Sequence, residues 1–279
     1  MIGRISNMLS RRALKFSNAW AAKFWHENPF TSAPMASADQ YRDLWTAEVA
    51  NSYPSIDDLE KLYGHAVDKA WMDDLALHTQ IVIKTSPLCY QHGRILYAAL
   101  SDFLAKRPKK SPPITIFETG TARGFSAIVM AKAMRDLNQS GRIITFDILP
   151  HDKKIYWNCI DDHEGKKSRS ELLAPWQDLT APYIMFIEGD SRINLGKVQA
   201  ERIEFAFLDG AHSYHDVTFE FERVAAYQQT GDVIVFDDYN MSDFSDLVRA
   251  VDDGCVRMGY DKKVITAKGD RRYVIATKM

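Results

Sequence analysis

Short apolar runs alternate with amphipathic stretches along the chain from residue 114 onward. The runs are β-prone and almost continuously apolar, and between them apolar side chains recur at helical spacing. This alternation is typical of a parallel sheet covered by helices on both faces. The pattern predicts strands at 114–118, 142–147, 183–188, 203–209 and 232–238, and helices at 125–137, 168–179, 191–198 and 215–227.

The end of the chain departs from this alternation. After a predicted helix at 243–258, two β-prone runs at 262–267 and 272–278 are joined by a Lys-Gly-Asp turn. A connection this short cannot make the crossover that parallel strands need, so we expect an antiparallel hairpin. The predicted fold is therefore α/β, with a mostly parallel seven-stranded sheet and a C-terminal antiparallel hairpin.

The chain before the sheet is predicted to be helical. Ser55 offers an N-cap ahead of two acids, and apolar side chains follow it at helical spacing. The Thr-Ser-Pro segment at 85–87 breaks this pattern before a further helix that leads into the first strand. We expect two parts: residues 1–85, a basic arm with a helical cap or lid, and residues 86–279, the domain that holds the sheet.

Residues 1–26 carry five basic side chains and no acid, with apolar side chains interspersed. An organelle transit peptide, a membrane-surface helix and an oligomer-contact arm share this composition, and so does a basic arm with no separate function. The continuous apolar centre of a secretory signal is lacking. A homo-oligomer held together through this N-terminal region is therefore one of the expectations.

Composition and charge narrow the class of protein. With 279 residues the chain can bury a sizeable core, and its net charge of −2 implies no general attraction to nucleic acid. No uninterrupted apolar run reaches the roughly 18 residues of a membrane span. Cys89, Cys159 and Cys255 are isolated and lack metal-ligand spacing, which indicates reduced thiols and a cytoplasmic location.

The stretch 114–124 combines a strand, a glycine turn and the start of a helix. Such a junction can hold a polar or anionic cofactor, because glycines allow close backbone approach and the helix offers unpaired N–H groups. A dinucleotide site needs Gly-x-Gly-x-x-Gly, and Ala122 occupies the middle glycine position. Glu118 at the strand end would repel a pyrophosphate but would suit an ammonium group. An ordinary strand-to-helix turn is the alternative.

Acids also end the fourth and fifth predicted strands. Asp209 ends one strand, and Asp237 and Asp238 end the next. Neighbouring strands lie about 5 Å apart, so we expect these three carboxylates to converge. Like charges in a partly dry site need a counter-charge, and Mg²⁺ binds through such oxygen ligands. The alternative is that Asp237 or Asp238 caps a helix or binds a backbone nest.

Two motifs resemble a known family. Glu118, Gly120 and Gly124 match motif I, E/D-x-G-x-x-x-G, of class I S-adenosyl-L-methionine (SAM) methyltransferases. The Asp-Gly-x-His-Ser-Tyr segment that begins at Asp209, with the later Asp-Asp pair, resembles the family of macrocin-type sugar O-methyltransferases and cephalosporin-hydroxylase-like proteins. It is also similar to metal-dependent catechol O-methyltransferases. The resemblance covers about residues 95–279.

The resemblance implies a Rossmann-like class I methyltransferase fold and assigns roles to strand-end residues. Glu118 would reach the ammonium group of SAM, and Asp147, 23 residues after Gly124, would accept hydrogen bonds from the ribose hydroxyls. Asp190 would face the adenine, although Asp147 and Asp190 could instead cap helices. The full expected cofactor-binding set is Glu118, Gly120, Thr121, Gly124, Asp147, Gly189, Asp190, Ser191 and Asp209, and the expected metal ligands are Asp209, Asp237 and Asp238.

The expected catalytic residues are His212 and Asp209. Some sugar methyltransferases place an acidic base two residues after the first metal aspartate, and here that position is Ala211. His212 is the replacement we predict, because an imidazole titrates near neutral pH and can accept a hydroxyl proton. A histidine that only packs at the helix start is the alternative, and His215 is a weaker candidate.

These expectations combine into one hypothesis. The chain is predicted to be a SAM-dependent O-methyltransferase, assisted by Mg²⁺, that acts on a hydroxylated small molecule such as a sugar-bearing natural product. The polar excursion at 151–179 would shape the acceptor pocket or would be a solvated surface segment. The competing hypotheses are a SAM-fold binding protein without catalysis and an NAD-dependent oxidoreductase.

Overall fold

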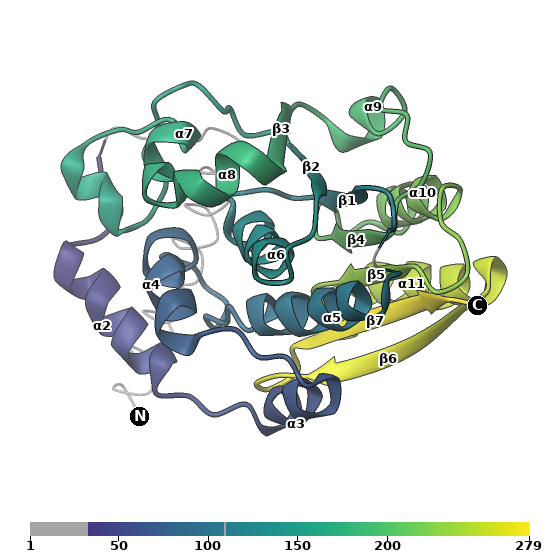
Figure 1. The fold of residues 1–279 in the computed structure, drawn as a ribbon. Helices are drawn as coiled ribbons and strands as arrows, with labels where there is room; N and C mark the ends of the chain where they lie inside the picture. The colour runs from purple at the N-terminus through teal and green to yellow at the C-terminus, as the bar shows by residue number, and fades with distance from the viewer. Residues whose placement is uncertain (1–32, 109) are drawn as a thin grey trace, which may run out of the picture.

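The computed structural model of the protein describes residues 33–108 and 110–279. Its centre is a seven-stranded sheet with the order β3-β2-β1-β4-β5-β7-β6, in which the strands from β3 to β5 are parallel and β7 runs antiparallel to both of its neighbours (Figure 1). The predicted fold and its C-terminal hairpin are therefore confirmed. The strands are β1 (Ile114–Thr119), β2 (Gly141–Asp147), β3 (Ile184–Glu188), β4 (Phe205–Leu208), β5 (Val233–Phe236), β6 (Tyr260–Thr266) and β7 (Arg272–Lys278).

Each face of the sheet packs against its own set of helices. Ile116 and Phe207 belong to the apolar cluster that includes α5 (His92–Lys106) and α6 (Phe125–Asp136). The alternate residues Phe117 and Leu208 belong to a second cluster with α10 (Tyr214–Ala225) and α11 (Ser245–Met258). Successive side chains of a strand point to opposite faces, so this alternation places a strand-end residue on a predictable side of the sheet.

The N-terminal helices pack onto the same core as the sheet. They are α2 (Ala38–Val49), α3 (Pro54–Tyr63) and α4 (Lys69–Thr79), and their buried side chains share one cluster with those of α5 and α6. Pro54 occupies the first turn of α3, so Ser55 lies inside the helix and is not the predicted N-cap. The basic arm at 1–26 lies outside the described residues, and the boundary at 85/86 stays a prediction.

The excursion after β2 differs from the single helix predicted at 168–179, and it is not a solvated segment. It forms α7 (Arg169–Leu172), η2 (Ala174–Trp176) and α8 (Gln177–Tyr183) after η1 (Ile160–Glu164). Its role in an acceptor pocket stays a prediction. Pro175 breaks the predicted helix, because proline disfavours helical backbone in the residue before it. The helix predicted at 191–198 is also shorter, and α9 spans only Ser191–Asn194.

The excursion is bound tightly to the N-terminal helices. The side-chain oxygen of Asn158 accepts hydrogen bonds from the hydroxyl of Tyr41 and the backbone N–H of Ile83, both at 3.0 Å. The side-chain amide of Asn158 donates to the carbonyl of Ile83 at 2.9 Å. Trp157 and Cys159 beside it are fully buried. The N-terminal helices therefore continue the same packed structure as the sheet.

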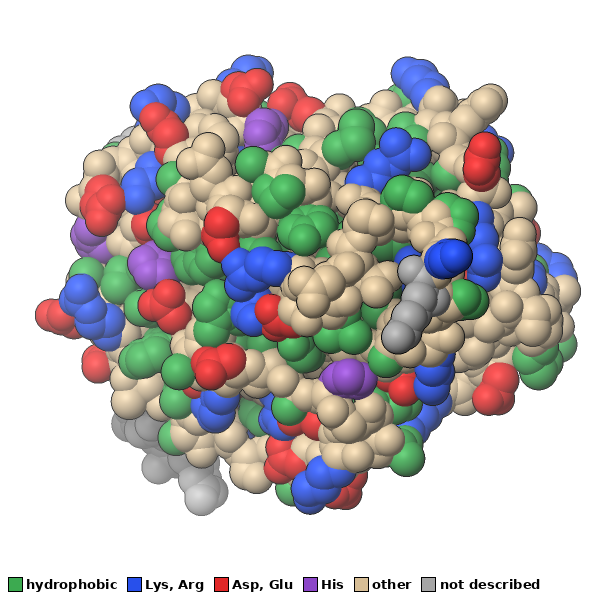
Figure 2. Space-filling view, viewed as in Figure 1, with side chains coloured by type: hydrophobic (Ala, Val, Ile, Leu, Met, Phe, Trp, Pro, Cys, Tyr) green, Lys and Arg blue, Asp and Glu red, His purple; other side chains and the backbone are tan. Residues whose placement is uncertain are grey.

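The described surface carries mixed charges. Figure 2 shows acidic and basic side chains interspersed over the visible face, with apolar atoms between them. All three cysteines are free and buried. Across residues 33–108 and 110–279, no helix has the length and apolar composition needed to cross a membrane.

Candidate active site

Glycines shape the turn that follows β1. Gly120 and Gly124 have φ values of 86° and 88°, in the left-handed region that glycine adopts without strain. A Cβ on Gly120 would lie 2.2 Å from the backbone carbonyl oxygen of Asp209, so only glycine allows this approach. The β1 turn and the end of β4 are therefore in direct backbone contact, and Gly124 starts α6 immediately afterwards.

Asp147 holds this turn from the neighbouring strand. One carboxylate oxygen accepts a hydrogen bond from the backbone N–H of Ala122, which has a left-handed φ of 44°. The other accepts from the backbone N–H of Leu149 at 2.7 Å. Gly189 donates its N–H to the carbonyl of Asp147 at 2.7 Å. Asp147 thus fixes the loops after β1, β2 and β3, and its contact with a ribose stays a prediction.

Glu118 lies beneath the turn and is fully buried. Its carboxyl group accepts hydrogen bonds from the hydroxyls of Ser126 and Thr145, and the hydroxyls of Thr145 and Thr121 also contact each other. Burial raises the pKa of Glu118 to about 7, against the opposing effect of its two hydroxyl partners. A cationic ligand group nearby would favour the ionised carboxylate.

Arg169 is a site residue that the sequence did not indicate. Its side chain is 1% exposed, and it donates to the backbone carbonyls of Ala122 at 3.0 Å and Leu149 at 3.3 Å. The guanidinium lies over the rings of Trp157 and Phe186 and 3.9 Å from the carboxylate of Asp147. The excursion therefore forms one wall of the cofactor side. The polar sequence of the excursion carries no signal that its arginine is buried.

In the loop after β3, Asp190 caps a helix, which is the alternative role given for it above. Asp190 accepts from the backbone N–H of Arg192 at 2.8 Å and forms an ion pair with the same residue, so it caps α9. Ser191 donates its hydroxyl to Glu220 at 2.7 Å, and Thr119 donates to the same buried carboxyl group at 2.8 Å. Burial raises the pKa of Glu220. Glu220 lies on the apolar face of the helix predicted at 215–227, and this position is the sequence signal for a buried acid.

Asp209, His212 and Asp238 converge at the ends of β4 and β5. Each offers one ligand atom, and these three atoms lie within 4.8 Å of one another. Nε2 of His212 lies 3.2 Å from Oδ2 of Asp238, and the imidazole ring stacks on Phe244 at 4.4 Å between centroids. The weaker candidate His215 is 86% exposed and points to Asp216.

Asp237 does not join this group. Its Oδ1 accepts the backbone N–H of Asp238 at 2.6 Å, and its Oδ2 accepts from Nη2 of Arg271 at 2.7 Å. Its side chain is 1% exposed. Arg271 precedes β7, 34 residues later in the chain, so spacing alone could not reveal the contact. The expected group of three carboxylates is thus two carboxylates and an imidazole, with the third carboxylate paired to an arginine.

Charge explains the protonation behaviour of this cluster. Burial, together with the neighbouring carboxylates Asp237 and Asp238, raises the pKa of Asp209 well above its ordinary value. Burial also acts to raise the pKa of Asp238, but its contact with His212 and the nearby Arg271 lower the pKa overall. Without a further cation the site therefore favours a proton on Asp209.

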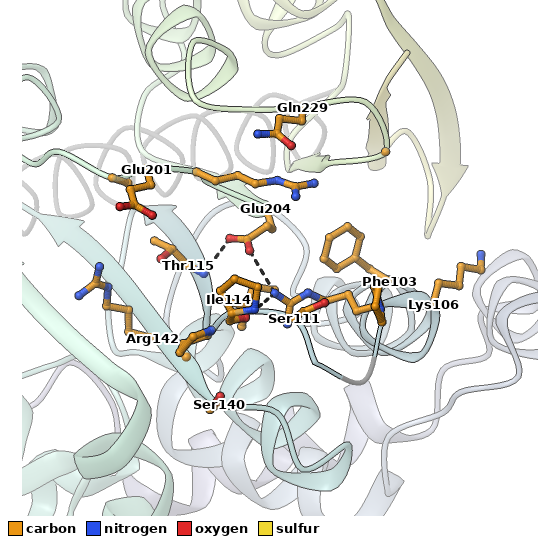
Figure 3. A pocket seen from close by; sticks show the side chains of 18 of the residues that line it. Phe103, Lys106, Ser111, Ile114, Thr115, Ser140, Arg142, Glu201, Glu204 and Gln229 are labelled. Carbon is orange, nitrogen blue, oxygen red and sulfur yellow. Dashed lines mark hydrogen bonds and ion pairs between the residues drawn. The ribbon is translucent and has the colours of Figure 1, made fainter.

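A cavity lies at the opposite end of the sheet from this cluster (Figure 3). It has a volume of about 1100 Å³ and is lined by residues at the amino ends of the parallel strands, among them Thr115, Arg142 and Glu204. Glu204 pairs with Arg107 at 3.1 Å and accepts the backbone N–H of Thr115 at 2.9 Å. Ligands of open α/β sheets bind beyond the carboxyl ends instead, so this cavity is separate from the candidate site.

Comparisons with known proteins agree with this geometry. Residues 117–239 match a family described as "Methyltransferase domain". The O-methyltransferase NovP is similar in structure, with a TM-score of 0.53, 16% identity, and coverage of 71% of this chain and 83% of NovP. The O-methyltransferase TomG from Streptomyces achromogenes, solved in complex with SAM, has a TM-score of 0.52 and 16% identity over 77% of this chain and 92% of its own.

None of the curated proteins matches the sequence. At 16% identity the two solved structures show the fold, and the family match covers the β1 turn, Asp209, His212 and Asp238. The match over residues 117–239 therefore supports a methyltransferase enzyme, and the chain has a Rossmann-like fold similar to that of the two solved O-methyltransferases.

Proposed function

We propose that the protein is a SAM-dependent O-methyltransferase that acts on a hydroxylated small molecule, such as a sugar-bearing natural product. The observation that carries this proposal is the backbone contact between Gly120 and Asp209. It joins the glycine turn, which suits a cofactor, to the ionisable cluster, which suits proton removal. Both lie at the carboxyl ends of the parallel strands, where ligands of such sheets bind.

The cofactor side is assigned to the β1 turn and the loops after β2 and β3. The SAM bound by TomG supports this cofactor for a chain of the same fold. We propose that Glu118 acts on the SAM ammonium group from beneath the turn and that Asp147 meets the ribose hydroxyls. The remaining members of the proposed set are Gly120, Thr121, Gly124, Gly189, Asp190, Ser191 and Asp209.

The cluster at β4 and β5 fits a divalent cation. Arg271 pairs with one of the three carboxylates, and Asp209 and Asp238 would carry a combined charge of −2 once a bound cation ionises both. These two carboxylates would hold the ion, and His212, the third member of the cluster, would stay unligated as the base. A carboxylate set suits Mg²⁺ or Mn²⁺. When bound, such an ion lowers the pKa of a substrate hydroxyl.

His212 is assigned the role of general base. Nε2 of His212 is buried, lies 3.2 Å from Oδ2 of Asp238 and has no hydrogen-bond partner among the described residues, so this nitrogen is available to take up a proton. The acceptor oxygen attacks the SAM methyl group in line, the carbon–sulfur bond breaks, S-adenosylhomocysteine leaves, and the hydroxyl proton passes to His212. The protein contributes alignment and proton removal, which are the usual sources of rate in such transfers.

Calorimetry tests the cofactor assignment. We expect SAM to bind the full chain and NAD to give no heat of binding, with SAM affinity changed little by Mg²⁺. Binding of NAD together with no response to SAM would contradict the proposal. Binding of SAM without methyl transfer to any hydroxylated acceptor would instead favour the non-catalytic hypothesis.

A further inference from the structure

The carboxylate of Asp237, one of the three that the sequence predicts as metal ligands, is held inside the fold by Arg271 of the C-terminal hairpin. We propose that Asp237 and Arg271 are positioning residues that keep Asp238 in a left-handed conformation and thereby aim its carboxylate at His212 and Asp209. The role of Asp238 itself rests on the proposed function. The conformational claim rests on contacts within the described chain alone.

The backbone of Asp238 needs such support. Its φ is 54°, in the left-handed region that non-glycine residues enter only with steric strain. The N–H of Asp238 donates to Oδ1 of Asp237 at 2.6 Å, and its carbonyl accepts the N–H of Asn240 at 2.7 Å. The N–H of Tyr239 donates to the carbonyl of Arg272 at 3.0 Å, which fastens the same loop to β7. The preceding carboxylate is therefore one of the contacts that fix this turn.

Arg271 fixes that carboxylate in turn. Its Nη2 donates to Oδ2 of Asp237 at 2.7 Å, and its Nε donates to the hydroxyl of Tyr273 at 2.9 Å. Tyr273 is fully buried on β7, the strand next to β5. Two hydrogen bonds from one rigid guanidinium determine its orientation, which lysine could not reproduce. Nη2 also lies 3.4 Å from Oδ1 of Asp238, so Arg271 contacts both aspartates.

Asp237 is poorly placed to be a metal ligand in this arrangement. Both of its oxygens already accept charge-assisted or backbone hydrogen bonds, and Nδ1 of the buried His92 lies 3.9 Å behind Oδ2. Burial, together with the charges of Arg271 and Lys84, lowers the pKa of His92 to about 3, so it adds no charge. Lys84 is exposed and forms no ion pair with the described residues. Arg271 is thus the cation that pairs with Asp237.

The same arrangement occurs on the cofactor side of the site. Ala122 also has a left-handed φ, of 44°, and its N–H also donates to a strand-end carboxylate, that of Asp147. Arg169 lies 3.9 Å from that carboxylate and is buried. Each half of the site therefore combines a non-glycine left-handed residue, an aspartate that binds its N–H, and a neighbouring arginine. This repetition supports a positioning role for Asp237.

Hydrogen exchange of the full chain tests the proposal without any ligand. In Arg271→Ala we expect the amide of Asp238 to exchange about tenfold faster or more, because a charge-assisted hydrogen bond contributes roughly 1.5–3 kcal/mol. Asp237→Asn should act in the same direction. Arg272→Ala is the matched control, since its side chain is exposed, and it should leave the exchange unchanged. Wild-type exchange in a folded Arg271→Ala variant would overturn the proposal.

Binding of Mn²⁺, measured by electron paramagnetic resonance, is a second test. A metal-ligand role and a positioning role for Asp237 predict opposite changes in Mn²⁺ affinity. If Asp237 were a metal ligand, Arg271→Ala would free it and remove a positive charge, and affinity would rise. If Asp237 positions Asp238, the same variant should bind Mn²⁺ about tenfold more weakly. A rise would overturn the proposal. Failure of wild type to bind Mn²⁺ would count against the metal in the proposed function, and hydrogen exchange would still decide the positioning role.

Discussion

Nε2 of His212 lies 3.2 Å from Oδ2 of Asp238. The pair joins the loop after β4 to the loop after β5, and the stacking of His212 on Phe244 limits the movement of the ring. A carboxylate beside an imidazole stabilises the imidazolium that forms when the ring takes up a proton. This contact is the structural basis for assigning proton removal to His212.

Replacing His212 should therefore reduce turnover strongly. For His212→Ala we expect a loss in kcat of roughly 10²-fold or more, the usual contribution of a positioned base. His215→Ala is the matched control, because His215 is 86% exposed and only three residues away. Single-turnover methyl transfer from labelled SAM measures both. Near-normal turnover in His212→Ala would remove it from the mechanism.

Replacing Asp238 should reduce metal-dependent turnover more than it reduces SAM affinity. Asp238→Ala should abolish any turnover that depends on a divalent cation, because it removes one of the two carboxylates of the cluster. Calorimetry should show that most SAM affinity remains. Asp246→Ala, at an exposed acid of α11, is the control. If wild-type activity is unchanged in EDTA, metal assistance is wrong.

The buried carboxyl of Glu118 should make stability depend on pH. Its pKa is raised from 4.5 to about 7, so the folded protein binds this proton more tightly than the unfolded chain, by about 3 kcal/mol. This contribution is fully present below pH 4.5 and is lost as pH rises through about 7. Glu118→Gln carries no titrating proton there and should lack this term.

Chemical denaturation of wild type and Glu118→Gln at pH 5 and pH 8 measures the effect. The free energy of unfolding of wild type should fall relative to that of the variant between the two values. Parallel pH dependence in the two proteins would show that Glu118 does not titrate in this range. SAM affinity should be lower in Glu118→Gln, because the neutral amide cannot pair with an ammonium group.

Asn158 should link the stability of the N-terminal helices to that of the sheet. Asn158→Ala removes the hydrogen bonds to Tyr41 and Ile83 and should lower the free energy of unfolding by about 2–4 kcal/mol. Asn138→Ala is the control, because Asn138 is also left-handed but is exposed and forms no side-chain hydrogen bond among the described residues. A loss no larger than that of the control would mean that the excursion is held elsewhere.

The fold was largely predictable because each strand is set by local apolar sequence. Ile116 and Phe117 alternate between the two faces as strand residues must, and the short turn before Arg272 allows only a hairpin. The break of the excursion at Pro175 was overlooked, although proline is a local signal. Burial of Trp157 and Asn158 depends on contacts with distant helices, which sequence spacing does not reveal.

The site was predictable at the level of strand ends but not of partners. Asp209, His212 and Asp238 converge because the topology places β5 next to β4. Which acids are already paired depends on side chains from other elements. Asp237 pairs with Arg271 of the hairpin, and Ser191 pairs with Glu220 in the middle of α10. These partners are distant in the sequence, so only the three-dimensional structure reveals them.

Transfer of a labelled methyl group from SAM to a hydroxyl oxygen is the reaction proposed for this protein, and it can be measured directly. The full chain is incubated with methyl-labelled SAM, with and without Mg²⁺, and a panel of hydroxylated acceptors, and the products are identified by mass spectrometry. We expect label on an acceptor oxygen with release of S-adenosylhomocysteine, and loss of this transfer in His212→Ala. Label on nitrogen or carbon only, or SAM binding with no transfer to any acceptor, would contradict it.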